Sequence, residues 1–263
     1  MTLMFESRLQ ERFVAAQEIA REAGALAMSL PPRGDGANLL VTEKTGKLDI
    51  CTEADQAVER LIRQKLADRF GDAMLGEEFG GALGERVWIV DPIDGTFNFA
   101  HGLGQWGISI GYVDQGVPSI GIVYAPVTDE LFAAQLNHGA SLNGHPIRVS
   151  SGVEYPLIEV GWSPAQPVEP FLTLVARLAE AGCEFRRMGS AALGLAQVAA
   201  GRSDAYIELF LKPWDALAGL VLVREAGGWV SDFLAGTGLT DGNPILACAP
   251  ALRERLSALS GIH

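Results

Sequence analysis

Hydrophobic positions in the first seventy residues follow a helical period. Between residues 5 and 30, apolar side chains recur at every third or fourth position, which places them on one side of an amphipathic helix. We expect Pro31-Pro32 and Gly34-Asp35-Gly36 to end this helix. A second helix is predicted from Thr52 to about Phe70. The apolar positions of the two helices are Leu9, Phe13, Ala16, Ala20, Ala23, Ala27 and Leu30, and then Val58, Leu61, Ile62, Leu66 and Phe70.

The pattern changes to short apolar runs after the second helix. Strands are predicted near 87–90, 105–113, 117–124 and 130–135, and the glycines and Pro118 between them are typical of turns in an antiparallel sheet. Past Ser150, helical and strand-like stretches alternate, which indicates a smaller α/β half. The predicted helices there are 168–181, 190–201, 214–226 and 250–259, and the strands are 157–161, 204–209, 228–232 and 245–248.

The chain contains neither an internal repeat nor a long linker. We therefore expect a single domain over residues 1–263, with subdomains 1–150 and 151–263 that share one crevice. A chain of 263 residues buries roughly three quarters of its unfolded surface and needs no covalent crosslink for stability. Its three cysteines lie far apart without a CxxC pair, which favours a reducing, cytoplasmic location.

The longest uncharged run, Gly95 to Val113, contains several glycines and polar residues, so we expect no membrane helix. The net charge of −12 disfavours direct binding of nucleic acid. It is equally unfavourable for a phosphate substrate unless bound metal ions reverse the local field. An acidic chain that handles phosphate therefore needs a metal site.

The segment Trp88-Ile-Val-Asp-Pro-Ile-Asp-Gly-Thr96 is the richest in candidate ligands. An apolar run ends in Asp91 and Asp94, and Gly95-Thr96 follows at once. By itself this could be an ordinary turn, or Thr96 could cap a helix. However, two carboxylates, the Ile93 carbonyl and two backbone amides together suit a hard cation bound beside an anion.

Four further acids also have structural explanations. Glu77 could be a solvated corner, Thr52-Glu-Ala-Asp55 matches a helix capping box, and an acid such as Asp215 is expected in the first turn of a helix. Glu208 could be an edge charge or could bind substrate hydroxyl groups. Each motif alone is weak evidence for a shared site, whereas the order of the motifs along the chain is specific evidence for one.

These motifs resemble the inositol monophosphatase family of magnesium-dependent, lithium-sensitive phosphatases. The resemblance rests on Gly76-Glu77-Glu78, on Trp88 to Thr96 and on Trp214-Asp215-Ala-Leu-Ala-Gly219, with supporting matches from about Lys44 to Ala249. It implies an α+β or α/β fold layered as an αβαβα sandwich. An N-terminal antiparallel sheet with two long helices would be followed by a smaller C-terminal α/β half.

The resemblance also implies two or three Mg²⁺ ions per site. Glu77, Asp91 and the Ile93 carbonyl would hold the first ion, Asp91, Asp94 and Asp215 the second, and a third would lie near Glu77. The reaction implied is attack of a metal-activated water on a phosphate monoester.

The other roles implied by the resemblance concern the phosphate, the alcohol and the water. Gly95 and Thr96 would contact the phosphate through their amides, and Thr96 with Asp55 would orient and deprotonate the attacking water. Asp94, Asp215, Glu208, Ser190 and Ala191 would contact the substrate, and Lys44 would lie near the site.

The predicted function is hydrolysis of a small polyol phosphate, most similar to inositol 1-phosphate, by a homodimeric enzyme. Phe97 and Trp106 depart from the pattern of inositol-selective relatives and could reshape the mouth of the pocket. Fructose-1,6-bisphosphatase, histidinol-phosphate phosphatase and adenosine 3′,5′-bisphosphate phosphatase are alternatives within the same chemistry. A regulatory protein-binding role is the alternative of another class, because some bacterial members associate with the transcription machinery.

Overall fold

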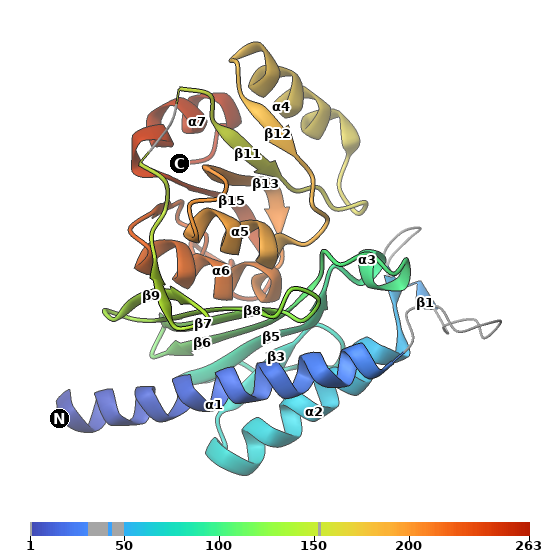
Figure 1. Cartoon of the computed structure of the whole chain (residues 1–263), viewed down its shortest axis with the longest axis vertical. Helices are drawn as coiled ribbons and strands as arrows, with labels where there is room; N and C mark the ends of the chain where they lie inside the picture. The colour runs from blue at the N-terminus through green and yellow to red at the C-terminus, as the bar shows by residue number, and fades with distance from the viewer. Residues whose placement is uncertain (1, 31–41, 44–49, 152–153) are drawn as a thin grey trace.

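The protein consists of five stacked layers, as the computed structural model in Figure 1 shows. The structure describes residues 2–30, 42–43, 50–151 and 154–263. Two long helices cover one face of an eight-stranded sheet, two helices lie between this sheet and a five-stranded one, and two more helices cover the outer face. The predicted αβαβα sandwich is therefore confirmed.

The helices lie close to the predicted ranges, except for the five-residue helix Thr96–Ala100, which no predicted range covered. They are α1 (Thr2–Ser29), α2 (Glu53–Phe70), α3 (Thr96–Ala100), α4 (Val168–Glu180), α5 (Ala191–Ala199), α6 (Pro213–Glu225) and α7 (Arg253–Ser260), with a 3₁₀ turn at Pro250–Leu252. In the described part of the chain, every helix is too short or too polar to span a lipid bilayer.

The strands include several short ones that the sequence did not predict. They are β1 (Thr42–Glu43), β2 (Ile50–Cys51), β3 (Ala73–Gly76), β4 (Gly80–Gly81), β5 (Arg86–Asp94), β6 (Gly107–Asp114), β7 (Val117–Ala125), β8 (Glu130–Gln135), β9 (Gly139–Leu142), β10 (His145–Ile147), β11 (Leu157–Val160), β12 (Glu184–Arg186), β13 (Ala205–Leu211), β14 (Trp229–Val230) and β15 (Asn243–Cys248).

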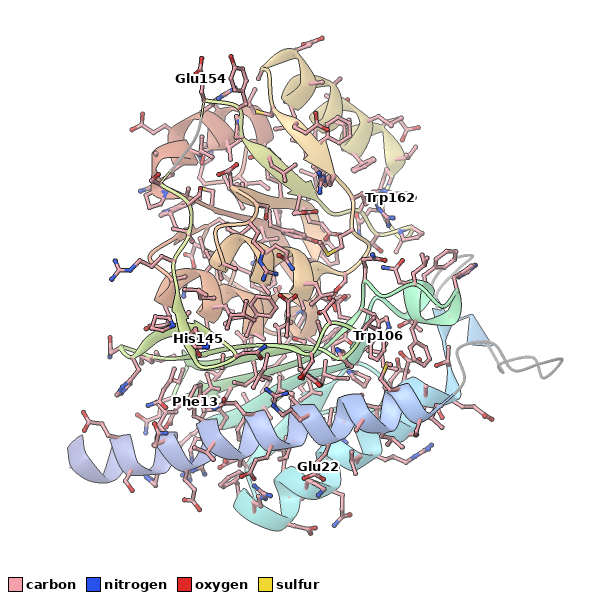
Figure 2. The ribbon with its side chains drawn as sticks, viewed as in Figure 1. Phe13, Glu22, Trp106, His145, Glu154 and Trp162 are labelled. Carbon is pink, nitrogen blue, oxygen red and sulfur yellow. The ribbon has the colours of Figure 1, made fainter. Side chains whose placement is uncertain are left out.

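The two long helices form the outer layer of the large sheet. The α1 face predicted from the sequence is buried, and Figure 2 shows Phe13 between this helix and the sheet. The predicted capping box opens α2: the Thr52 hydroxyl accepts hydrogen bonds from the Ala54 and Asp55 amides, and Asp55 accepts one from the Thr52 amide. The predicted end of α1 at residues 31–36 lies outside the described residues.

The large sheet has the order β10-β9-β8-β7-β6-β5-β3-β4. Its neighbouring strands are antiparallel, as predicted, except that β3 runs parallel to β5. A two-residue turn of Gln115 and Gly116, with φ of 50° and 80°, joins β6 to β7. Two positive φ values in succession give the hairpin turn that matches the twist of the strands.

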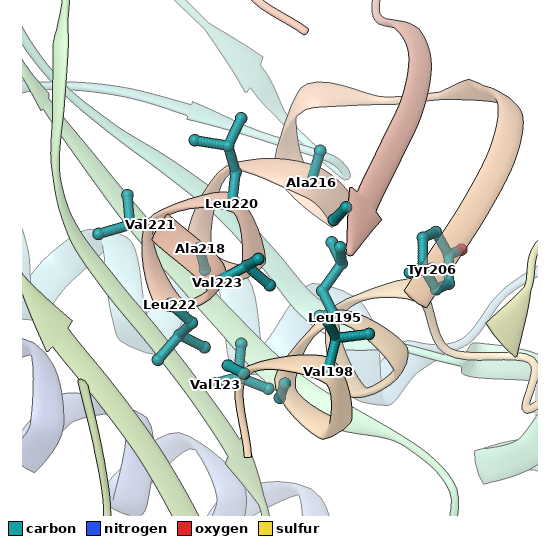
Figure 3. Close-up of a cluster of buried hydrophobic side chains, with 14 of the residues drawn as sticks. Val123, Leu195, Val198, Tyr206, Ala216, Ala218, Leu220, Val221, Leu222 and Val223 are labelled. Atoms are coloured by element: carbon teal, nitrogen blue, oxygen red, sulfur yellow. The ribbon is translucent and has the colours of Figure 1, made fainter. Parts of the chain in front are cut away.

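The middle layer of helices packs closely between the sheets. Figure 3 shows Val223 of α6 on the side of Leu195 of α5, and Val198 of α5 near Val123 of β7. A Cβ atom at Gly121 of β7 would lie 2.2 Å from the Ala218 carbonyl oxygen of α6, so only glycine permits this approach. The packing fixes the start of α6 against the large sheet, where the Ser109 hydroxyl donates a 2.9 Å hydrogen bond to the Trp214 carbonyl.

The small sheet has the order β12-β11-β13-β15-β14, in which β11 is parallel to both of its neighbours. Parallel strands end at the same edge of a sheet, so the residues after β11 lie beside the end of β13. This edge and the starts of α5 and α6 meet the end of β5. The fold thereby brings segments about 120 residues apart in the chain, from Asp94 to Asp215, to one place.

Candidate functional site

The end of β5 carries two acids that are almost inaccessible to solvent. Asp91 and Asp94 are 2% and 7% exposed, and the strand register shifts between them. The Ile93 amide donates a 2.9 Å hydrogen bond to Asp91 Oδ1, which fixes the turn of chain between the two acids. Buried carboxylates are costly unless they are paired or bind a cation.

Asp91 forms one cluster with Glu77 and Asp215. One carboxylate oxygen from each residue lies within 4.8 Å of the other two. Glu77 follows β3, and its amide donates to the Val90 carbonyl of β5, so the parallel pairing sets Glu77 beside Asp91. Asp215 comes from the first turn of α6. Three elements thus converge on one set of oxygen atoms.

Asp94 is held at the start of α5 and faces the same crevice. Its Oδ2 accepts hydrogen bonds of 2.6 Å from the Ser190 hydroxyl and from the Ala192 amide. Ser190 is the N-cap of α5 and also accepts from the Leu193 amide. A carboxylate at a helix N-terminus is favoured by the free amides and by the helix dipole.

Among the described residues, negative charge dominates the electrostatics of this cluster. Burial raises the pKa of Asp91 well above its usual value, and the nearby charges of Glu77 and Asp215 raise it further. Burial also raises the pKa of Asp215, with Asp94 and Glu77 adding to the effect. For Asp94, burial outweighs the hydrogen bonds from Ser190 and Ala192 and raises the pKa to about 6.

The donor set fits a hard divalent cation. All three clustered side chains offer carboxylate oxygen, which Mg²⁺, Ca²⁺ and Mn²⁺ prefer over nitrogen or sulfur donors. The carboxylates repel one another, and this repulsion raises their pKa values. A bound cation would attract all of them instead. The acidic cluster is therefore a candidate metal site.

Asp55 and Thr96 form a second pair next to the cluster. The Thr96 hydroxyl lies 3.0 Å from Asp55 Oδ1 and 3.1 Å from the Ile93 carbonyl, and its single proton can serve one of them at a time. Asp55 Oδ2 accepts from the Thr52 hydroxyl at 2.5 Å. Burial is the main cause that raises the pKa of Asp55 to about 6.

Gly95 provides the backbone conformation that links the acids to Thr96. Its φ is 97°, and a Cβ atom there would lie 2.9 Å from the Gln105 carbonyl oxygen. Both observations exclude a larger residue. The helix cap considered at Thr96 is instead Gly95, which is the N-cap of α3, and Thr96 is the first residue of that helix.

A pocket of about 160 Å³ opens beside these residues. Its lining includes Asp94, Asp215, Ser190, Ala191 and Glu208, together with the end of β11 and the chain after it, from Val160 to Ser163. The Tyr206 hydroxyl donates a 2.5 Å hydrogen bond to Glu208 Oε2, and burial raises the pKa of Glu208 to about 7. The pocket is lined mainly by groups that bind hydroxyls.

Known proteins match this chain over almost its whole length. The sequence model of the inositol monophosphatase family matches residues 8–261. The chain belongs to this family. It is 40% identical to the fructose-1,6-bisphosphatase/inositol-1-monophosphatase of Thermotoga maritima over 217 residues, which cover 82% of each chain. It is also 35% identical to the Nus factor SuhB of Escherichia coli K12 over 258 residues, 92% of this chain and 96% of SuhB.

Solved structures of the family share the fold. The IMPase of Thermotoga maritima superposes with a TM-score of 0.84 at 34% identity, covering 95% of this chain and 97% of that one. The extragenic suppressor protein suhB of Bartonella henselae gives 0.85 at 35% identity, covering 94% and 96%. The family recognised from the sequence motifs is therefore confirmed.

The structure brings most of the predicted site residues into this one crevice. Their positions around the acidic cluster, in the Asp55–Thr96 pair and in the pocket are given above. Lys44 lies outside the described residues. Membership of the family leaves the individual role of each residue as a prediction.

Three positioning residues were missed by sequence reasoning. Glu59 of α2 is fully buried and accepts hydrogen bonds from the Glu78 and Phe79 amides, so it supports the turn that carries Glu77. Asn98 donates to the Gln105 and Met188 carbonyls and ties α3 to the loop before α5. Tyr206, which holds Glu208, lies two residues before it on a strand and could have been found from that spacing.

Proposed function

We propose that this chain is a Mg²⁺-dependent phosphomonoesterase that hydrolyses a small polyol phosphate such as inositol 1-phosphate. The observation that carries the proposal is the convergence of Glu77, Asp91 and Asp215 within 4.8 Å, beside the pocket that Asp94 lines. Family membership supports a phosphatase without selecting its ester.

The residues proposed to hold Mg²⁺ are Glu77, Asp91, Asp94 and Asp215 with the Ile93 carbonyl. Two or three ions per site are expected from the resemblance to the family. When bound, Mg²⁺ would lower the pKa of water and balance charge on phosphate oxygens.

The chain's own groups would then manage the proton and orient the phosphate. Thr96 is proposed to accept a hydrogen bond from the attacking water while its hydroxyl donates to Asp55, since the 3.0 Å contact already exists. Asp55 is thus a candidate for receiving the proton. The amides at Gly95 and Thr96, at the start of α3, would donate to phosphate oxygens.

The alcohol part of the substrate would lie toward Glu208. A carboxylate held by Tyr206 at 2.5 Å, with Ser190 and Ala191 in the lining of the same pocket, suits a molecule with several hydroxyl groups. Fructose 1,6-bisphosphate stays a candidate because a relative at 40% identity carries that activity in its name. Histidinol phosphate and adenosine 3′,5′-bisphosphate complete the set to be compared.

The test is phosphate release with Mg²⁺ from these four esters, with a parallel series in excess chelator. Turnover of at least one ester that disappears with chelator is expected. Full activity in chelator would contradict the metal-dependent reaction.

Two variants separate catalysis from folding. Asp215→Asn and Glu77→Gln should lower kcat to the background level while circular dichroism remains that of the parent. Glu254→Gln is the matched control, because it removes an exposed first-turn acid from another helix, α7. Substantial turnover by Asp215→Asn would refute the assignment.

A second candidate function is a regulatory role through protein contacts in the cytoplasm. It is favoured by relatives named Nus factor SuhB at 34–39% identity. The Asp215→Asn variant distinguishes the two functions: normal growth with it, together with recovery of transcription factors on the tagged protein, would favour the regulatory role. A homodimer, also proposed, is tested by light scattering after gel filtration.

A further inference from the structure

A cavity of about 540 Å³ lies at the end of the large sheet that faces away from the acidic cluster. Strands β5 to β8 alternate in direction, so the end of β8 lies opposite Asp94, the last residue of β5. Figure 2 labels Phe13, which lines the cavity, at the left and Trp106, directly before β6, at the right. The cavity and the pocket beside Asp94 share no lining residue.

The charges that this cavity offers to a ligand are positive. Its lining contains three ionisable side chains, those of His138, Arg148 and Glu225. Glu225 already uses both carboxylate oxygens, since it accepts hydrogen bonds of 3.0 Å from the Asn137 amide and 2.9 Å from the Gly139 amide. His138 and Arg148 are exposed, and neither forms an ion pair with another described residue. In a chain of net charge −12, this is a local site for an anion.

A buried amide in the same lining has no partner. Gln135, the last residue of β8, is 2% exposed, and its Oε1 atom accepts no hydrogen bond from any described residue. An apolar side chain would serve packing here, as it does at Ala133, which precedes Gln135 on the same face of the strand. A buried amide without a partner costs free energy, so its presence points to a hydroxyl or amino group that donates to it.

These groups together define the chemistry of a ligand. A guanidinium such as that of Arg148 binds carboxylate and phosphate groups through paired hydrogen bonds. Gln135 accepts from a hydroxyl group, and Gln10 and Ser141 add further polar side chains to the lining. The volume lies within the range usual for sites that bind small molecules. The cavity therefore suits a molecule that combines one anionic group with several hydroxyl groups.

We propose that this cavity is a binding site, separate from the catalytic one, for a small polyol that carries a carboxylate or a phosphate. The inference goes beyond the proposed phosphatase function and does not depend on it, because binding at this end of the sheet requires neither metal nor turnover. The shared chemistry is an anion on a hydroxylated carbon chain, and the experiment separates its two sources.

The test compares three linear six-carbon polyols that differ at one end: gluconate, sorbitol 6-phosphate and sorbitol. Titration calorimetry is carried out in chelator, where the acidic cluster presents only carboxylates to an anion. At least one of the two anions should bind at least about tenfold more tightly than sorbitol, because hydrogen bonds to charged groups are the stronger ones. Tight binding of sorbitol 6-phosphate alone identifies a phosphate site, of gluconate alone a carboxylate site, and of both a site for either anion. Equal affinities of all three, or no binding, would overturn the inference.

Two arginine variants locate the binding. Arg148→Gln should weaken binding of the tighter anion at least about tenfold, since it removes the charged donor. Arg60→Gln is the matched control, because it removes an exposed arginine of α2 outside the cavity lining, and it should leave the affinity unchanged. An equal loss in both variants, or a loss in neither, would show that the anion binds elsewhere and would overturn the proposed site.

Gln135→Met tests the role of the buried amide. It keeps the length of the side chain and removes the atom without a partner, so the affinity for the same anion should fall while the melting temperature without ligand stays equal or rises. A lower melting temperature would show that a buried water already satisfies the amide, which would overturn the argument from Gln135. Phosphate release by these variants should equal that of the parent, so failure of this inference leaves the proposed function intact.

Discussion

At the scale of single residues, the site is defined by buried carboxylates that lie close to one another. Asp91 is buried beside two other carboxylates, and its pKa is raised first by burial and then by Glu77. Asp129 shows the opposite case, because hydrogen bonds from Tyr124 and Arg21 lower its pKa at the protein surface. The difference between these two aspartates gives a direct test of the electrostatic account.

We predict that Asp91→Asn stabilises the metal-free protein at neutral pH. A carboxyl whose folded pKa is raised contributes stability below its unfolded pKa, near 3.8, and that stability is lost as the pH rises through the folded value. Asparagine does not ionise, so the melting temperature of the variant should exceed that of the parent by a margin that grows from pH 4 to pH 8. The measurement is thermal unfolding in chelator.

The control is Asp129→Asn, for which the sign reverses. A lowered folded pKa gives stability above the unfolded value of 3.8 that is lost as the pH falls, so this substitution should cost more at pH 7 than at pH 3. If Asp91→Asn lowered the melting temperature at pH 8 in chelator, repulsion within the cluster would be refuted.

At the scale of elements, the capping box of α2 does more than start a helix. Thr52 binds both the first amides of α2 and Asp55 Oδ2, while the other oxygen of Asp55 accepts from Thr96. One oxygen atom of Asp55 therefore belongs to the helix cap, and the other contacts Thr96 in the candidate site. The capping motif thus also positions a candidate proton acceptor.

Thr52→Ala is expected to lower the free energy of unfolding by about 1 kcal/mol, the usual cost of a lost N-cap. Because Asp55 also loses its 2.5 Å partner, kcat should fall by more than the stability loss explains at a temperature where the variant is folded. Thr52→Ser keeps the hydroxyl and should restore both quantities. Denaturant unfolding and phosphate release measure them, and equal kcat in Thr52→Ala and Thr52→Ser would refute the positioning role.

The sequence predicted the elements with long periodic patterns and missed those that depend on distant contacts. Both long helices, the four central strands of the large sheet and the alternation in the second half were predicted close to their observed bounds. The four-residue strand β3 was missed, because its parallel pairing with β5 gives no local signal. Short strands such as β4 and β12 are defined by their neighbours in the same way.

The candidate site, too, was predictable from local sequence patterns but not where it depends on distant contacts. The motifs identified the acids, because polar residues at the end of an apolar run are visible in the sequence. The support for them was not visible: Glu59 is one of several acids on α2, and only the fold shows that it binds the Glu78 amide. Likewise, the contact of Ser190 with Asp94 joins residues 96 positions apart.

At the scale of the whole molecule, close packing of the layers determines where Asp215 lies. The helix that carries it, α6, is pressed against β7 at Gly121, where a Cβ atom would meet the Ala218 carbonyl at 2.2 Å. Backbone atoms cannot move aside as a flexible side chain can. The spacing between the large sheet and α6 thus sets the position of Asp215 relative to Asp91.

Gly121→Ala is expected to destabilise the protein by about 1–3 kcal/mol, the usual cost of overpacking, and to weaken Mg²⁺ binding because α6 is displaced. Gly84→Ala is the matched control, since its nearest new contact is the Ala73 side chain at 3.3 Å. Denaturant unfolding and calorimetric Mg²⁺ titration measure the two effects. Unchanged stability of Gly121→Ala would show that the layers tolerate a wider spacing.

The central claim is that carboxylates from both halves of the chain share divalent cations. Crystals soaked in Mn²⁺, which takes the same oxygen ligands as Mg²⁺, allow the ion to be located by anomalous scattering. The account predicts an anomalous peak in contact with Asp91 and Asp215, with Glu77 or Asp94 completing the protein ligands. A fully occupied Mn²⁺ peak elsewhere, with none at these carboxylates, would contradict it.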